Sequence, residues 1–121
     1  MAKSIVIYGI KNCDTMRKAR GWLDERRVAY SFHDYKVAGI DRDHLERWCK
    51  KVGWEALLNR NGTTFRKLPD KDKNGLDADC AVALMLAQPT MIKRPVLEFG
   101  GGGLLVGFAA ERYEEAIAAL S

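Results

Sequence analysis

Apolar residues along the first third of the chain follow two different spacings, which predict a β-α-β opening. Residues 4–8 are largely apolar and β-branched without alternation, as is typical of a central strand of an α/β sheet. From Asp14 to about Arg26 the apolar positions recur at helical spacing, and residues 28–33 then alternate as in a second strand. A strand, a crossover helix and a second strand imply parallel pairing with a right-handed connection. The apolar face of the helix consists of Met16, Ala19 and Leu23.

The middle of the chain has helical periodicity interrupted by polar segments. Asp41 is a candidate N-cap for a helix that Gly53 ends, and residues 54–58 form a further short helical piece. Residues 59–70 are polar and rich in turn-forming residues, which predicts a surface loop long enough to suggest a function. Another helix is expected to begin at a cap, Asp77 or Asp79, and to end before Pro89.

The last part of the chain predicts a hairpin followed by a helix. Residues 96–99 and 104–108 are short apolar runs joined by four glycines, and residues 109–120 return to helical spacing. The order is therefore β-α-β, a helical stretch, then β-β-α. We expect an α/β fold in a single domain, residues 1–121, with a helical insertion at about 37–88.

Composition and charge favour a protein that works in a reducing compartment. The 121 residues are 47% hydrophobic, and the net charge of +4 comes from basic residues scattered among acidic ones, which argues against direct nucleic-acid binding. The cysteines at 13, 49 and 80 form no CxxC pair, so neither a disulfide framework nor a metal site is indicated. The apolar run near the N-terminus is too short for a signal peptide or a membrane span. We therefore expect a cytoplasmic protein that does not associate with membranes.

Cys13 is the strongest candidate for a catalytic residue because it lies where the first strand passes into the first helix. A helix N-terminus stabilises an anion, and the thiolate is the nucleophilic form of cysteine. Lys11, Arg17 and Lys18 add positive charge nearby. Cys49 and Cys80 are instead expected to pack in the core, although Cys80 stays open as a resolving thiol.

Several motifs carry a resemblance to a known family. They are Tyr8-x-x-x-x-Cys13-x-x-x-Arg17, Gly9-Ile-Lys-Asn-Cys13-Asp-Thr, His33-Asp-Tyr35, Gly53-Trp-Glu-Ala-Leu-Leu-Asn-Arg60, Gly62-Thr-Thr-Phe-Arg-Lys-Leu68, Lys93-Arg94-Pro95 and Leu105-Val-Gly-Phe108. Together they resemble the arsenate reductase (ArsC)-like family over essentially the whole chain. The likeness is greatest to its YffB subgroup, which is related to the Spx branch.

The resemblance implies a thioredoxin-like fold with a nucleophilic Cys13 and a pocket of arginines for an anion. Arsenate reductases of this family use three such arginines, together with glutathione and glutaredoxin. Arg94 matches one arginine, Arg60 lies within a residue of another, and the third falls in residues 105–108, which contain no arginine. Pro95 matches the family's cis-proline that faces the nucleophile. The arsenate pocket is thus incomplete, and arsenate reduction is demoted to a weak activity.

The Spx branch implies an alternative role, in which the protein regulates transcription by binding RNA polymerase. Many of its members use a CxxC redox switch, but Met16 stands at the position of the second cysteine, and a thioether forms no disulfide. The preferred hypothesis is a glutathione-dependent thiol/disulfide reductase with one nucleophilic cysteine. Glutathione is its co-substrate, glutaredoxin is a further partner, and no bound cofactor or metal is expected. The candidate residues for binding substrate or glutathione are Lys11, Asn12, Arg60, Arg66, Arg94 and Pro95.

Overall fold

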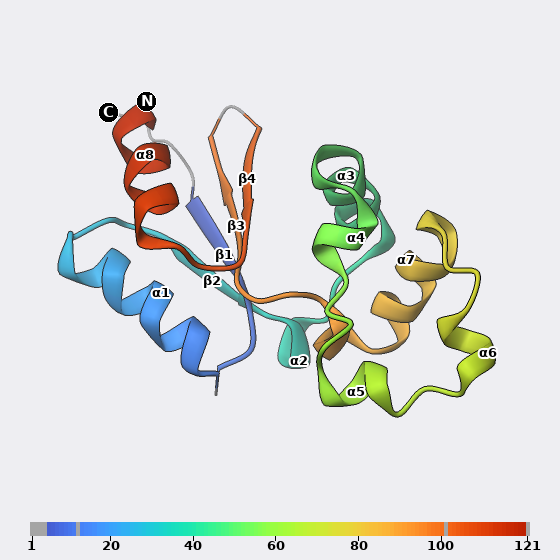
Figure 1. Cartoon of the computed structure of the whole chain (residues 1–121). Coiled ribbons are helices and arrows are strands. Elements are labelled where there is room, and N and C mark those ends of the chain that lie inside the picture. Colours follow the sequence, from blue (N-terminus) through green and yellow to red (C-terminus); the bar gives the residue numbers. More distant parts are fainter. Residues whose placement is uncertain (1–4, 12, 101, 121) are drawn as a thin grey trace. The chain divides into compact units, whose positions relative to one another are not determined.

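The computed structural model describes residues 5–11, 13–100 and 102–120, with the backbone alone described at Leu120. The chain divides into two compact units, which are described separately (Figure 1). We call Met1–Asp34 together with Arg94–Ser121 the sheet unit, and Tyr35–Lys93 the helical unit. The expectation of one domain with an insertion at about 37–88 stays a prediction.

The sheet unit is built on four strands in the order β2-β1-β3-β4. The strands are β1 (Ile5–Gly9), β2 (Ser31–Asp34), β3 (Val96–Phe99) and β4 (Gly103–Val106). β1 pairs with β2 in parallel and with β3 antiparallel, and β3 and β4 form the expected antiparallel hairpin. The apolar first strand is therefore central, as its lack of alternation predicted.

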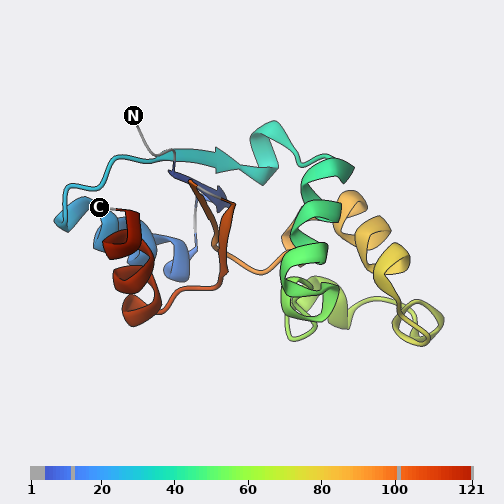
Figure 2. The ribbon, with the colours of Figure 1, turned by 90° about the horizontal axis from the view of Figure 1, so that it is seen from above.

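Two helices, α1 (Asp14–Glu25) and α8 (Ala110–Leu120), cover one face of this sheet (Figures 1 and 2). The predicted apolar face of α1 is confirmed, because Met16, Ala19 and Leu23 are fully buried. α8 contributes Tyr113, whose ring makes edge-to-face contacts with Trp22 of α1 and with Phe108. The arrangement is the thioredoxin-like fold that the sequence resemblance implies. The remaining buried residues of this core are Ile5, Ile7 and Leu97.

Close packing explains one glycine of the β3–β4 connection. A Cβ atom at Gly103 would lie 2.0 Å from the Phe99 ring, so the ring occupies the space that a side chain would need. The glycine run is thus required in part by cross-strand packing, in addition to the turn itself.

The helical unit contains more helices than the sequence pattern predicted. Its elements are α2 (Tyr35–Ala38), α3 (Arg42–Val52), α4 (Trp54–Leu57), α5 (Thr63–Arg66), α6 (Asp70–Lys73), α7 (Ala78–Ala87) and the 3-10 turn η1 (Pro89–Met91). The segment 59–70, expected to be a loop, contains the one-turn helix α5. Its Phe65 is 7% exposed, so α5 is anchored by burial of one aromatic side chain.

Both predicted caps of the longer helices are present. The Asp41 carboxylate accepts a hydrogen bond from the His44 N–H at 2.9 Å, and the Asp77 carboxylate accepts one from the Cys80 N–H at 2.8 Å. Gly53 ends α3 with a φ of 85°, a conformation that favours glycine. The Asn59 N–H also donates to the Met91 carbonyl at 2.7 Å, which joins the segment after α4 to η1.

Candidate functional site around Cys13

Cys13 is the N-cap residue of α1. Its backbone is extended, with φ of −143° and ψ of 130°, and its carbonyl accepts a hydrogen bond from the Arg17 N–H at 2.9 Å. The side chain is half-buried and packs against the edge of the sheet unit's core. The thiol is therefore held at the start of the helix, with part of its surface open to solvent.

The register of the sheet brings Arg94 to the same place. Val96 at the start of β3 pairs with Tyr8 near the end of β1, so residues just before β3 lie beyond the end of β1, where α1 begins. The peptide bond between Arg94 and Pro95 is cis, as the family resemblance implies. Pro95 is buried, and its carbonyl accepts a hydrogen bond from the Gly107 N–H at 2.8 Å. The Arg94 side chain, itself half-buried, interacts with the Cys13 thiol.

These surroundings lower the pKa of Cys13. Burial by itself raises the pKa, but the backbone N–H of Met16, the Arg94 side chain and the N–H of Thr15 all stabilise the thiolate and outweigh it. The positive charge of Arg94 lowers the pKa further. A thiolate that accepts hydrogen bonds from a helix N-terminus and an arginine is an activated nucleophile.

The other cations predicted near Cys13 are exposed to solvent. Lys11 is exposed, and Arg17 is exposed and pairs with Asp14 at 2.9 Å, a surface ion pair of small energetic value. Lys18 is exposed as well, whereas Asn12 lies outside the described residues. Arg94 is thus the cation whose interaction with the Cys13 thiol the structure establishes.

Arg60 and Arg66 belong to the helical unit. Both are exposed; the Arg60 guanidinium lies 5.7 Å from the centre of the Trp54 ring, and the Arg66 carbonyl accepts a hydrogen bond from Lys73 Nζ at 2.7 Å. Their part in binding a substrate stays a prediction.

The position three residues after Cys13 is filled by Met16, which is fully buried. All three cysteines are free thiols, and the other two lie in the helical unit. Cys13 is thus the one cysteine of the described part of the sheet unit. No second thiol of that unit can therefore attack a disulfide formed at Cys13.

The core placement predicted for Cys80 is wrong. α7 buries Ala81, Val82 and Met85, whereas Cys80 in its first turn is exposed beside the capping carboxylate of Asp77. That carboxylate raises the pKa of Cys80 by accepting a hydrogen bond from it and by its charge. The Asp-x-x-Cys spacing at a helix start is the signal that could have predicted this contact.

Cys49 is half-buried on α3 beside the buried residues Leu45 and Trp48. Burial, followed by the charge of Glu46, raises its pKa. Of the three cysteines, Cys13 is the one whose surroundings favour the thiolate.

The residues that the structure describes include neither a membrane-spanning helix nor a metal-binding cluster. Among these residues no helix is both long and apolar enough to cross a membrane. Within the same ranges, no group of three or more histidine, cysteine or acidic side chains is placed to hold a metal ion.

Comparison with known proteins identifies the family. The model of the ArsC family matches residues 8–116. The chain belongs to the ArsC family. An uncharacterized protein of Haemophilus influenzae is 40% identical over 114 residues, covering 94% of this chain and 99% of its own length. The global transcriptional regulator Spx of Streptococcus mutans is 25% identical over 95 residues, covering 77% of this chain and 69% of its own.

Solved structures of ArsC-family proteins share the fold. The YFFB protein superposes with a TM-score of 0.91 at 63% identity, covering 93% of this chain and 98% of the other. An arsenate reductase (ArsC) related protein from Brucella melitensis has a TM-score of 0.75 at 57% identity, with 94% of each chain covered. The arsenate reductase of Vibrio cholerae has a TM-score of 0.81 at 23% identity and covers 95% of this chain and 98% of its own, a likeness in fold alone.

Proposed function

We propose that this ArsC-family protein is a glutathione-dependent thiol/disulfide reductase with Cys13 as its nucleophile. The observation that carries the proposal is the Cys13 thiol at the N-cap of α1, with its pKa lowered by backbone N–H groups and by Arg94. Such a thiolate attacks a disulfide sulfur efficiently at neutral pH. Membership of the ArsC family, which includes arsenate reductases, supports redox chemistry at this cysteine.

The reaction runs in two exchanges. The Cys13 thiolate attacks the glutathione sulfur of a mixed disulfide, forming a Cys13–glutathione disulfide and releasing the substrate thiolate, which takes a proton from solvent. A second glutathione, as its thiolate, attacks the glutathione sulfur of this adduct, so that oxidised glutathione leaves and the Cys13 thiolate is restored. An external thiol is required because Met16 replaces the second cysteine of a CxxC pair.

Arg94 has two roles in this proposal. It stabilises the Cys13 thiolate before attack and again when it is the leaving group of the second exchange. With Lys11, Asn12, Arg60, Arg66 and Pro95, it is also a candidate to hold the carboxylates of glutathione, which arginine recognises in bidentate geometry. Because the reaction consumes reduced glutathione, we place it in the cytoplasm, with glutaredoxin as an alternative acceptor of the adduct.

The test is turnover of the mixed disulfide between glutathione and 2-mercaptoethanol, measured with wild type, Cys13→Ser and a Cys49→Ser, Cys80→Ser double variant. We expect the double variant to retain wild-type turnover and Cys13→Ser to have none above the uncatalysed rate. When free glutathione is withheld, the second exchange cannot occur, and mass spectrometry of the wild type should then show one glutathione on Cys13. Turnover that survives in Cys13→Ser, or that is absent from the wild type, would contradict the proposal.

The alternative that the Spx resemblance implies, regulation of transcription by binding RNA polymerase, is separable by experiment. A disulfide switch between Cys13 and the residue at position 16 is unavailable to this chain because Met16 is a thioether. The regulatory role would be favoured over the enzymatic one by two results together: wild type and Cys13→Ser both bind purified RNA polymerase, and the wild type does not turn over the mixed disulfide.

A further inference from the structure

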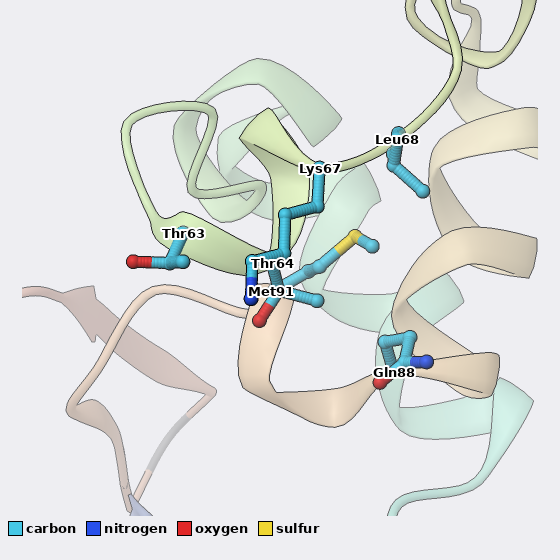
Figure 3. Close-up of a pocket in the computed structure, with 6 residues that line it drawn as sticks. All are labelled: Thr63, Thr64, Lys67, Leu68, Gln88 and Met91. Carbon is cyan, nitrogen blue, oxygen red and sulfur yellow. The ribbon is translucent and has the colours of Figure 1, made fainter.

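The helical unit contains a pocket that the chemistry at Cys13 does not use. It has a volume of about 280 Å³ and lies where α5 and the residues after it meet the end of α7 and η1 (Figure 3). That size is at the lower end of small-molecule sites, which favours a short ligand. The lining residues are Thr63, Thr64, Lys67, Leu68, Gln88 and Met91. Four of them belong to the Gly62–Leu68 motif, whose role the reductase proposal leaves unexplained apart from Arg66.

The local backbone holds the two sides of this pocket together. The hydroxyl groups of Thr64 and Thr90 lie 3.2 Å apart and form a hydrogen bond that joins α5 to η1. Met91 is 1% exposed, and its N–H donates to the Gln88 carbonyl at 2.9 Å. The burial of Phe65 also anchors α5. The pocket is thus formed by anchored segments of the helical unit that are at least twenty residues apart in the sequence.

The lining combines an apolar base with polar groups that have hydrogen-bonding capacity to spare. The half-buried Leu68 provides accessible apolar surface, and the almost fully buried Met91 closes the base of the pocket. In the part of the chain that the structure describes, the side chains of Thr63, Lys67 and Gln88 form no hydrogen bond or ion pair. Figure 3 shows the Lys67 side chain extending over α5 towards Thr64 and Met91. Leu68 and Gln88 lie to the right of these three residues in the view.

The charge of the lining selects the class of ligand. Lys67 is the one charged residue among the six, so a cation finds no counter-ion there. A phosphate group with two charges is usually held by several cations, whereas this lining offers one. One ammonium group, hydroxyl and amide donors, and an apolar base together match a single carboxylate on a short hydrocarbon chain.

We propose that this pocket binds the carboxylate of a short aliphatic acid, with the carboxylate at Lys67 and the hydrocarbon chain against Leu68 and the base that Met91 closes. The same chemistry occurs in a free fatty acid of a few carbons and in the C-terminal residue of a peptide that ends in an aliphatic side chain. The site is independent of Cys13 and of the proposed reductase activity.

The test follows the ε-methyl resonances of methyl-labelled methionine during titration with hexanoate, with hexanamide as the uncharged control. We expect a saturable shift of Met91 in the millimolar range, no shift of Met16 in the sheet unit, and little response to hexanamide. Titrations with N-acetyl-glycyl-leucine and with its C-terminal amide separate the two sources. Tighter binding of the acid form of this peptide than of hexanoate assigns a peptide terminus, and the reverse order assigns a free acid.

Two lysine variants complete the test. Lys67→Gln should weaken hexanoate binding about fivefold, the upper range for a solvent-accessible ion pair. Lys71→Gln, which removes the same charge from exposed α6 outside the lining, should leave binding unchanged. The proposal fails if Met91 does not shift, if hexanamide shifts it as much as hexanoate, or if both variants weaken binding equally.

Discussion

The side chain of Met16 lies directly against Gly9. A Cβ atom at Gly9 would lie 2.3 Å from Met16 Sδ and 2.8 Å from its Cε. The contact joins the first turn of α1 to the end of β1, the two elements that flank Cys13. The thioether at the position of a CxxC resolving cysteine is thus part of the core that fixes the nucleophile.

Replacing Gly9 by alanine should destabilise the fold by about 1–3 kcal/mol, the usual cost of overpacking a filled core. The added methyl group has to displace the fully buried Met16 side chain. The free energy of unfolding, measured by urea denaturation, checks this. The cost of Gly9→Ala should shrink in a Met16→Ala background, and an unchanged cost there would mean that this contact is not its cause.

Gly21 offers a matched control on α1. A Cβ at Gly21 would meet no atom within 4 Å, and the residue lies inside the helix. Gly21→Ala should therefore stabilise the protein by about 0.5–1 kcal/mol, because alanine favours helix more than glycine does. Opposite signs for the two glycine-to-alanine changes separate local packing from a general effect of the substitution.

Met16→Cys should convert the single-cysteine site into a dithiol site. It places a thiol three residues after Cys13 in the first turn of α1, the spacing of a Cys-x-x-Cys pair. We expect oxidation to form a disulfide between the two residues, and reduction of the glutathione adduct to proceed without external glutathione. Thiol counting and peptide mass mapping detect the bond. A Met16→Cys protein that keeps two reduced thiols under mild oxidation would show that the buried position 16 cannot reach Cys13.

The sequence predicted the elements that bury continuous apolar faces and missed those held by one or two side chains. The central strand, the apolar face of α1, the Asp41 and Asp77 caps and the glycine-linked hairpin are all present. The short helices α2, α5 and α6 have four residues each, too few to display a period, and α5 depends on the burial of Phe65.

The same contrast holds for the site. The position of Cys13 at a helix start follows from local periodicity, and the structure confirms it. The interaction of Arg94 with Cys13 depends on pairing between β1 and β3, strands that are about ninety residues apart, so family resemblance alone predicted it. Apolar periodicity could not reveal the face of α7 that carries Cys80, because almost every residue of this helix is apolar.

Asp77→Asn should increase the reactivity of Cys80. Asp77 raises the pKa of this exposed thiol, so removing the carboxylate charge lowers the pKa and increases the thiolate fraction near pH 8. Asparagine is also a good N-cap, so α7 should keep its start. The alkylation rate of each cysteine, resolved by mass spectrometry, is the measurement. In wild type at pH 7, Cys13 should react before Cys80 despite the greater exposure of Cys80; the reverse order would contradict the assignment of thiolate character.

Arg94→Gln should raise the pKa of Cys13, because it removes the charged guanidinium that stabilises the thiolate by a hydrogen bond and by its positive charge. The inflection of the alkylation rate against pH should move to higher pH, and turnover at pH 7 should fall with the thiolate fraction. Arg17→Gln is the matched control, since Arg17 is exposed and paired with Asp14. An inflection that moves equally in both variants would assign the effect to net charge instead of to Arg94.

The lowered pKa of Cys13 also makes stability depend on pH, with a definite sign. A group that loses its proton more easily in the folded state stabilises that state above the pKa of the unfolded thiol, about 8.5, and loses this contribution as the pH falls through the folded pKa. The difference in unfolding free energy between wild type and Cys13→Ser should therefore shift in favour of wild type as the pH rises through this window. The same difference in an Arg94→Gln background should vary less with pH, because the folded and unfolded pKa values are then closer together. Urea unfolding from pH 6 to pH 9.5 measures both trends, and a difference that does not change with pH would show that Cys13 is not held as a stabilised thiolate.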